Sequence, residues 1–501
     1  MKEKNLPQNV AIALFVKDEI SDIAGWIAWH AALGVQTFFI YDDHSTDGTW
    51  EILQAAAKCY DVRLRRTDPL KTPHFGDRQR DAYMQTVQEA KGEFEWLGFL
   101  DGDEYLYLKH FDTLPEFLLY FPHADAIAFS WRIYGSSGRV IRPRIPIVEA
   151  FTQHSNKDFP DNLHVKSFVR PQKMGLKWFD PHYFDIPKEH YARPSRKFIN
   201  IAGPKQEVEW SDAFIMHFIC RSMEHYVQRI KRRLNADLSD STDYWHYFDR
   251  NEENDPDPLR FIPKMQEKLA PIRREALKMA IQKLKDLPIT PDPIYYSQKI
   301  SEPKFEFFKI LTHCQTMLYY APQLGEAVHC LPEIAAVEKF LPIFGIVDKK
   351  TESLITLFIA GDDTNSLLKI PYDFRPSCRL LYRLVPQQNS GHALLNPISQ
   401  RFICFLPPEA NGIGKVEANR EKAHDWEKIA LFKTTFDLNF PLKKLPFNPS
   451  EKTSAHALLN WIKTASELPD AETFLQIFYC LSPKVRQEIS NYASGLLWDF
   501  I

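Results

Sequence analysis

The chain has 501 residues, which at roughly 150 residues per domain predicts about three domains. Hydrophobic residues make up 44% and charged residues 25%, a globular composition that excludes a disordered or fibrous protein. Lys and Arg number 62 against 65 Asp and Glu, a net charge of −3, which argues against a dedicated nucleic-acid binder. With only 18 glycines, a glycine-rich phosphate loop is not expected either.

The seven cysteines are scattered and include no Cys-x-x-Cys pair, so we expect buried thiols in a reducing compartment. Residues 1–8 are polar and lack the apolar core of a secretion signal. No run of 18 uncharged apolar residues occurs, so no transmembrane helix is expected. These features predict a cytoplasmic protein. Peripheral contact with the inner face of the membrane is compatible with this prediction.

The first hundred residues alternate short apolar runs with amphipathic stretches. We expect strands at 10–16, 37–41, 62–64 and 94–100, and helices at 21–33 (with Ser21 as a plausible cap), 47–57 and 77–90. This alternation predicts an α/β fold, a mostly parallel Rossmann-like sheet with helices on both faces. Ligands bind beyond the carboxyl ends of the strands in such sheets.

The rest of the chain is less regular. We expect strands at 126–131 and 165–170, a basic amphipathic helix at 222–238, a proline-rich acidic loop at 251–258 and a helix at 263–285. From about residue 305 we expect helical pieces to about 340, then strands at 354–359, 380–384, 402–406 and 429–436, then helices from 454. The predicted domains are therefore a catalytic domain at 1–240, a helical extension or linker at 241–300, and a mixed α+β C-terminal domain at 301–501.

The segment Asp101-Gly102-Asp103-Glu104 directly follows the apolar run Trp96–Leu100. Two carboxylates one residue apart on a tight turn can chelate one divalent cation whose open positions accept diphosphate oxygens. Gly102 would let the backbone turn without a steric cost. Solvated turn acids are the alternative, but the position at the end of a buried strand favours a site.

A second acidic segment, from Asp42 to Asp47, follows the second strand. Asp42 and Asp43 are placed to accept hydrogen bonds from a nucleoside base or ribose. Asp47 is better explained as a structural cap of the helix that follows.

Several motifs in this order resemble family 2 glycosyltransferases, and especially the subgroup related to family 92. They are Val16-Lys17-Asp18-Glu19, the segment 26–35, Tyr41-Asp42-Asp43-His44-Ser45-Thr46-Asp47, Gln79 within 76–83, Asp101-Gly102-Asp103-Glu104-Tyr105-Leu106, Lys166-Ser167-Phe168-Val169-Arg170-Pro171, His182 and Met216-His217-Phe218. The resemblance covers residues 9–235. Lys17-Asp18-Glu19 departs from the Asn-Glu of many relatives.

The resemblance implies an A-type glycosyltransferase fold that binds a nucleotide-sugar, with a UDP-sugar favoured, together with Mn²⁺ or Mg²⁺. It implies that Asp101, Asp103 and His217 bind the metal, with Asp101 also near the ribose. The implied nucleotide-sugar site comprises Glu19, Asp42, Asp43, Gln79, Asp101, Lys166 and His182. Lys166 and Arg170 are candidates to offset diphosphate charge, and His182 is expected near the acceptor. Because His217 lies between apolar residues, a core histidine is the alternative for it.

An inverting transfer needs a general base for the acceptor hydroxyl. The candidates are Asp180, Glu149, Asp158 and Asp161, among which spacing does not decide. We favour Asp180, because it neighbours His182 in an aromatic stretch suited to a sugar face, and keep Glu149 as the second choice. Residues 131–138 are the expected acceptor loop, aromatic at Trp131 and flexible at its two glycines.

The sequence therefore predicts a metal-dependent, inverting glycosyltransferase acting on a glycan or lipid-linked acceptor in surface polysaccharide synthesis. A nucleotidyltransferase is one alternative, but the residues after the first strand, Lys17-Asp18-Glu19, contain no glycine. A catalytically degenerate module that binds a sugar or a partner is the other. The basic helix at 222–238 would dock on anionic lipid or be a solvated helix face.

Overall fold

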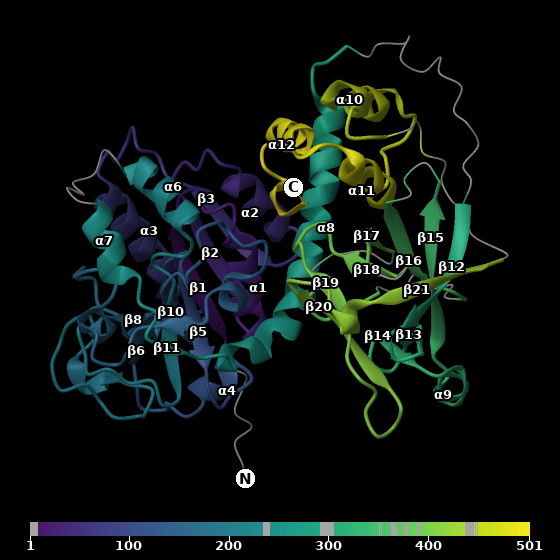
Figure 1. The fold of residues 1–501 in the computed structure, drawn as a ribbon. Coiled ribbons are helices and arrows are strands. Elements are labelled where there is room, and N and C mark those ends of the chain that lie inside the picture. The colour runs from purple at the N-terminus through teal and green to yellow at the C-terminus, as the bar shows by residue number, and fades with distance from the viewer. Residues whose placement is uncertain are drawn as a thin grey trace. The chain divides into compact units, whose positions relative to one another are not determined.

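The computed structural model describes residues 9–233, 241–290, 305–349, 351, 353–361, 368–373, 375, 379–387, 391–435, 445, 447 and 449–500. The chain forms two compact units, Met1–Ile272 and Arg273–Ile501 (Figure 1). The predicted boundaries at 240 and 300 differ from this division, and both lie outside the described residues. The long helix α8 (Ile262–Asp286) instead contains the boundary.

The N-terminal unit is built on a nine-stranded sheet in the order β3-β2-β1-β4-β8-β6-β10-β5, with β9 beside β6. Its strands are β1 (Val10–Val16), β2 (Thr37–Asp42), β3 (Asp61–Arg66), β4 (Trp96–Leu100), β5 (Glu104–Leu108), β6 (Ala126–Ile133), β8 (Val165–Val169), β9 (Tyr191–Ala192) and β10 (Ala213–His217). Its longer helices are α1 (Ile23–Ala32), α2 (Thr49–Ala57), α3 (Phe75–Ala90), α6 (Met223–Arg233) and α7 (Ser241–Phe248). Shorter pieces are α4 (Leu114–Leu118), α5 (Ile147–Ala150), the pair β7 (Gln153–His154) and β11 (Glu253–Asn254), and the 3-10 turns η1 (Pro160–Leu163) and η4 (Asp257–Phe261).

The predicted α/β class is confirmed. Strands β3, β2, β1 and β4 are parallel, and all residues of β1, β2 and β4 are buried, as expected for central strands covered on both faces. Successive side chains of a strand point to opposite faces. Phe38 packs against Trp26 of α1, whereas Phe39 joins the core cluster that contains Tyr83 of α3. Helices therefore cover both faces of the sheet.

One edge of this sheet gathers the ends of many strands. The carboxyl ends of β1, β2 and β4 lie there, and β6 and β10 point the same way because β8 is antiparallel to both β4 and β6. Strands β8 and β5 run in the opposite direction and begin at this edge, at Val165 and Glu104. The acidic segments after β2 and β4 consequently belong to one edge, as the sequence predicts.

Two local expectations are wrong. Ser21 does not cap α1, which begins at Ile23 after Asp22; its hydroxyl bonds to the Asp22 carboxylate instead. Gly102 does not use the left-handed backbone region that only glycine adopts easily. A Cβ there would lie 3.5 Å from Glu19 Cγ, an ordinary contact.

The C-terminal unit is dominated by an antiparallel sheet of ten strands in the order β12-β21-β18-β17-β16-β15-β13-β14-β20-β19, with further pairings β12–β15, β12–β13 and β18–β19. The strands are β12 (Phe305–Thr312), β13 (Met317–Ala321), β14 (Glu326–Cys330), β15 (Leu341–Asp348), β16 (Leu354–Ile359), β17 (Leu380–Pro386), β18 (His392–Leu395), β19 (Phe402–Phe405), β20 (Gly414–Arg420) and β21 (Ile429–Thr434). Its helices are α9 (Pro332–Glu338), α10 (Ala455–Thr464), α11 (Ala471–Cys480) and α12 (Pro483–Tyr492).

The predicted strands at 354–359, 380–384, 402–406 and 429–436 and the helices from 454 are confirmed in this unit, as far as the described residues reach. The helical pieces predicted from about 305 to 340 are wrong, since this stretch forms β12, β13 and β14, and only α9 is helical. Its aromatic residues favour strands, and antiparallel pairing with β15 and β21 buries part of them. Across the described helices of both units, none is long and apolar enough to cross a membrane.

Candidate active site

The turn between β4 and β5 holds the Asp-Gly-Asp-Glu motif and is fixed from beneath by α1. The indole N–H of Trp26 donates to the carbonyl oxygens of Asp101 (3.0 Å) and Glu104 (2.8 Å). The Glu104 carboxylate accepts the backbone N–H of Asp101 at 2.8 Å. The two aspartates of the motif therefore project from a rigid turn at the edge where the strand ends meet.

Lys166 of β8 reaches into this turn. Its ammonium, fully buried, lies 2.8 Å from Asp101 Oδ2 and 3.3 Å from Glu104 Oε2. Burial opposes the charge on Lys166, but Asp101 and Glu104 raise its pKa above the usual range. Burial also raises the pKa of Glu104 to about 8, with the neighbouring aspartates adding to the shift. The Lys166 ammonium thus lies between two carboxylates of the turn, with its shorter contact to Asp101.

Asp103 faces two different partners. Its Oδ1 lies 3.6 Å from Nε2 of His217, at the end of β10, and its Oδ2 lies 3.1 Å from Nη1 of Arg229 in α6. Burial opposes ionisation of Asp103, yet His217 and Arg229 hold its pKa well below the ordinary value. Burial lowers the pKa of His217. A carboxylate and an imidazole, both buried, therefore lie side by side.

The donor types expected for a divalent cation are only partly assembled. Asp103 and His217 form a carboxylate–imidazole pair, and Nδ1 of His217 is buried with no hydrogen-bond partner among the described residues. Asp101 is directed to Lys166 instead. Within the described ranges, no group of three or more His, Cys, Asp or Glu side chains is arranged to hold a metal ion. The three-ligand metal site stays a prediction.

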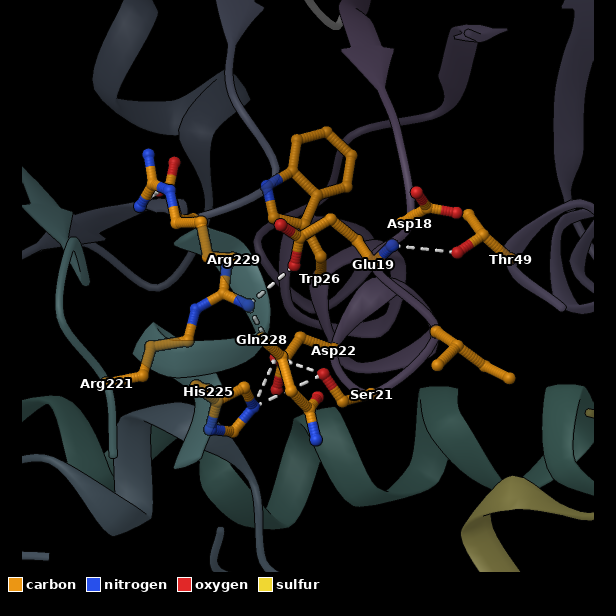
Figure 2. Close-up of polar contacts among 12 residues, drawn as sticks. Asp18, Glu19, Ser21, Asp22, Trp26, Thr49, Arg221, His225, Gln228 and Arg229 are labelled. Carbon is orange, nitrogen blue, oxygen red and sulfur yellow. Dashed lines mark hydrogen bonds and ion pairs between the residues drawn. The ribbon is translucent and has the colours of Figure 1, made fainter. Parts of the chain in front are cut away.

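Helix α6 is tied to the loop that follows β1 (Figure 2). The guanidinium of Arg221, just before α6, donates to Glu19 at 2.5 Å and to Asp22 at 2.8 Å. His225 Nε2 lies 3.4 Å from Asp22 Oδ2, and its Nδ1 lies 2.9 Å from the Ser222 hydroxyl. Arg221 adopts a left-handed backbone with φ of 54°. Glu19, predicted to support the nucleotide end of the sheet, is therefore held by α6.

Side-chain hydrogen bonds connect the loops that follow β1 and β2. Asp47 accepts the N–H of Thr49 at the start of α2 and, with its other oxygen, the N–H of Ile20. Asp18 accepts the N–H of Thr46, and the Asp18 N–H donates to the Ser45 hydroxyl. The prediction that Asp47 caps α2 is wrong, because Gly48 is the N-cap residue and makes no side-chain cap bond; Asp47 instead joins the start of α2 to the loop after β1.

Asp42 and Asp43 are at the predicted edge but are paired within the protein. Arg66 Nε donates to Asp42 at 2.7 Å, and Arg78 binds both oxygens of Asp43 at 2.7 and 2.8 Å. Burial opposes the ionisation of Asp43, but the hydrogen bonds of Arg78 and Thr67 outweigh it and lower its pKa. The nucleoside contact of both aspartates stays a prediction. Gln79, beside Arg78 in α3, is half-buried.

Three imidazoles surround Trp131 of β6. The ring centroid of Trp131 lies 4.2 Å from that of His217, 5.1 Å from His164 and 5.2 Å from His182. His182 bonds through Nδ1 to the Val165 carbonyl at 3.0 Å, and burial together with Lys166 lowers its pKa to about 3. His182 is therefore neutral, and its place in the nucleotide-sugar site stays a prediction.

The two residues predicted as general bases have other surroundings. Asp180 Oδ1 accepts the backbone N–H groups of His182 (2.7 Å) and Tyr183 (2.9 Å), so it closes a turn. Glu149 lies in the short helix α5. Their catalytic roles stay predictions.

The expected acceptor loop is closely packed at the first of its two glycines, Gly135, whereas a Cβ on Gly138 would meet no described residue within 4 Å. A Cβ on Gly135 would lie 2.2 Å from the Arg250 carbonyl, and the N–H groups of Ser136 and Ser137 donate to Asp249 and Asn251. Residues 134–138 are thus held by the segment that follows α7.

Sequence reasoning missed three residues of this edge: Arg221, Arg229 and His164. The basic pattern of the 222–238 segment was visible, but Arg229 turns to Asp103 instead of lying on a solvated or lipid-facing side. The side chains of Lys231, Arg232 and Arg233 lie outside the described part of the chain.

This arrangement has a counterpart among known proteins. Residues 10–234 match the model of glycosyltransferase family 92. The match covers β1 to α6 and therefore contains every side chain of the acidic edge. The predicted resemblance to family 92 is confirmed for this segment, and it supports the prediction of a glycosyltransferase. The family 2 label stays a prediction.

Curated family 92 proteins from plants resemble part of the chain. A protein from Ricinus communis is 35% identical over 232 residues, which are 44% of this chain and 36% of that protein. One from Oryza sativa subsp. japonica is 25% identical over 197 residues, 38% of this chain and 31% of that protein. The matched segment thus spans about a third of the length of these relatives.

Among solved structures, S. aureus TarS (residues 1–349) aligns with 55% of this chain and 85% of its own, at 15% identity and a TM-score of 0.25. Glucosyl-3-phosphoglycerate synthase from Mycobacterium tuberculosis aligns with 33% of this chain and 58% of its own, at 14% identity and a TM-score of 0.19.

Proposed function

We propose that the chain is a glycosyltransferase that moves a sugar from a nucleotide-sugar to an acceptor hydroxyl with inversion. The family 92 match over residues 10–234 carries this proposal, because the matched segment contains the edge at which the acidic turn, His217 and the cations of β8 and α6 meet. That edge is where open α/β sheets bind ligands.

The charges of the edge suit a nucleoside diphosphate. Lys166, Arg221 and Arg229 are cations that lie against carboxylates of the protein in the absence of ligand. A diphosphate is a stronger anion than any one of these carboxylates and is bound well by guanidinium and ammonium groups. We therefore assign these three cations to the donor's diphosphate and favour a UDP-sugar as donor.

A divalent cation, Mn²⁺ or Mg²⁺, would be held by Asp103 and His217, with Asp101 as the third ligand once it leaves Lys166. Such an ion supplies positive charge that stabilises the leaving diphosphate. Lys166 and Arg229 would act by binding the donor. They lie beside Asp101 and Asp103, the two carboxylates that would bind the cation.

The acceptor in this proposal is a glycan or lipid-linked glycan of surface polysaccharide synthesis. Trp131, at the end of β6, offers an aromatic ring beside His217 and His182 for a sugar face. We place the reaction in the cytoplasm, with a lipid-linked acceptor presented at the inner membrane face.

Thermal unfolding with nucleotides tests the donor site. The chain is heated with UDP, GDP, CMP or dTDP, each with and without Mn²⁺, and the wild type is compared with Asp103→Asn. A nucleotide at a hundredfold its Kd stabilises the native state by about 2.7 kcal/mol. We expect one nucleotide to raise the Tm of the wild type only with Mn²⁺, and to leave Asp103→Asn unchanged.

A second candidate is a catalytically degenerate module that binds a sugar or a partner. It is favoured by one observation, the internal pairing of Asp42, Asp43, Asp101 and Asp103 with Arg66, Arg78, Lys166 and Arg229. If no nucleotide changes the Tm of the wild type, with or without Mn²⁺, this candidate replaces the transferase.

A further inference from the structure

His164 lies between the turn η1 and strand β8, at the edge that holds the acidic turn. Its backbone is fixed on both sides: its N–H donates to the Asp161 carbonyl at 3.1 Å, and its carbonyl accepts the N–H of Trp131 at 2.8 Å. Its ring faces the Trp131 ring at 5.1 Å, and the same Trp131 ring contacts His217, the neighbour of Asp103. One tryptophan therefore separates His164 from the predicted donor site.

Asp161 determines which ring nitrogen of neutral His164 carries the proton. Nδ1 lies 3.2 Å from the Asp161 carbonyl oxygen, which can only accept a hydrogen bond, and 3.7 Å from the carboxylate Oδ1. The proton of the neutral ring is thus placed on Nδ1, which leaves the lone pair on Nε2. The second carboxylate oxygen, Oδ2, is held by the Tyr247 hydroxyl of α7 at 2.6 Å.

Nε2 of His164 is available for a ligand. No contact among the described residues engages this atom, and the side chain is 23% exposed. Among the described residues, the indole N–H of Trp131 and Nδ1 of His217 are buried without hydrogen-bond partners. The half-buried His164 ring, with Nε2 not engaged by these residues, therefore adjoins the aromatic ring of Trp131, which is the kind of surface that a sugar face packs on.

We propose that His164, oriented by Asp161, is the general base that takes the proton of the acceptor hydroxyl; this rests on the proposed glycosyltransferase function. The hydroxyl proton passes to Nε2, and the oxygen's electron pair forms the bond to the anomeric carbon. The bond from that carbon to the diphosphate oxygen breaks, and its electron pair leaves with the nucleoside diphosphate. Asp161 stabilises the imidazolium and acts as a positioning residue. His164 releases its proton to solvent after the transfer.

The neighbouring candidates are less suitable. Asp180 uses Oδ1 to hold two backbone N–H groups of its own turn. His182 lies 6.0 Å from His164, ring to ring, but its lowered pKa of about 3 makes it a weak base at neutral pH. Within the described part of the chain, the titratable groups around His164 are Asp161 on its own turn, His182 on the following loop, Lys205 as its β-bridge partner and, through Asp161, Tyr247.

The test uses the full chain with UDP-glucose, UDP-galactose, UDP-N-acetylglucosamine and GDP-mannose as donors. It measures, from pH 5 to 9, the nucleoside diphosphate released when the sugar is transferred to water or to a p-nitrophenyl glycoside. We expect His164→Gln to lower kcat about 10²- to 10⁴-fold, the usual contribution of a general base, with the donor KM unchanged. The fall in rate on the acid side, where the base is protonated, should vanish in this variant. His190→Gln is the matched control, because His190 also pairs with a carboxylate (Asp125, 3.2 Å) but precedes β9, at the opposite edge of the sheet.

Asp161→Asn keeps the inference testable if His164→Gln does not fold. Without the carboxylate the His164 ring is held less firmly in its orientation, so kcat should fall while the donor KM stays unchanged. If His164→Gln keeps wild-type kcat and its pH profile, or if Asp180→Asn alone abolishes turnover, the assignment of His164 is wrong while the transferase proposal stands. If the wild type neither binds nor cleaves any of the donors, the proposed function fails and the inference fails with it.

Discussion

At the scale of single residues, the acidic edge is a set of buried ion pairs whose loss should be costly. Asp43 and Arg78 are both nine-tenths buried or more and share two hydrogen bonds. Removing one partner of such a pair leaves an uncompensated charge and costs about 3–5 kcal/mol. We expect Arg78→Ala to lower the free energy of unfolding by this amount, measured by urea denaturation at pH 7.

Arg80 provides the matched control on the same helix. It pairs with Asp77 and Asp81, but all three side chains are about half exposed, so Arg80→Ala should change stability far less than Arg78→Ala. Because the folded state lowers the pKa of Asp43, the stabilisation from Arg78 is present above the unfolded pKa of about 3.9 and is lost as the pH falls. Equal losses in the two variants would mean that the Asp43–Arg78 pair does not stabilise the fold.

At the scale of elements, helix α1 forms a hydrogen bond to the backbone of the edge strand β5 through His30. His30 is fully buried; its Nδ1 lies 2.9 Å from the Trp26 carbonyl, and its Nε2 accepts the N–H of Leu106 at 3.3 Å. Burial lowers the pKa of His30 to about 3, against about 6.5 in an unfolded chain. Between these values the unfolded chain binds one more proton, so this group makes the protein less stable as the pH falls from about 6.5.

We therefore expect His30→Gln to flatten the pH dependence of stability. Glutamine cannot be protonated, so the variant should lose less stability than the wild type between pH 7.5 and 5, in urea unfolding series at fixed temperature. At pH 7.5 it should be less stable by about 1–3 kcal/mol, because a buried hydrogen bond is disturbed. The exposed His123→Gln should keep the wild-type pH dependence, and parallel curves for wild type and His30→Gln would refute this account.

At the scale of the whole molecule, the sequence predicts what depends on local patterns. Continuous apolar runs predicted the buried strands β1, β2 and β4, and the position of Asp101 and Asp103 after β4 placed them at the ligand-binding edge. The partners of these acids were not predictable, because Arg78 is 35 residues from Asp43 and Arg229 is 126 residues from Asp103. Such pairs depend on the register of distant strands and on which face of a helix turns inward.

The prediction of helical pieces at residues 305–340 was wrong for a related reason. Residues 305–321 contain aromatic and β-branched residues that are only partly buried along β12, so their sequence lacks a clear alternation. Their strand conformation comes from pairing with β15 and β21, which lie later in the chain. The surroundings of His164 were only partly visible in sequence: Asp161 lies three residues before it, but Trp131 meets it only through the antiparallel pairing of β6 and β8.

The division of the chain gives a last prediction. The sequence predicted a catalytic domain that ends at residue 240, but η4 and the first turns of α8 complete the N-terminal unit. Phe261, Ile262 and Met265 are buried there, and Phe261 packs on Trp29 at 5.7 Å. Burying such a side chain contributes about 1.5–3 kcal/mol, and domains are stable by only about 5–15 kcal/mol.

A chain of residues 1–240 should therefore unfold without a cooperative transition, whereas residues 1–272 should unfold cooperatively and keep the nucleotide-dependent rise in Tm of the full chain. Calorimetry of the two shortened chains measures both. Cooperative unfolding of residues 1–240 at the Tm of the longer chain would show that the segment after 240 adds nothing to the N-terminal unit.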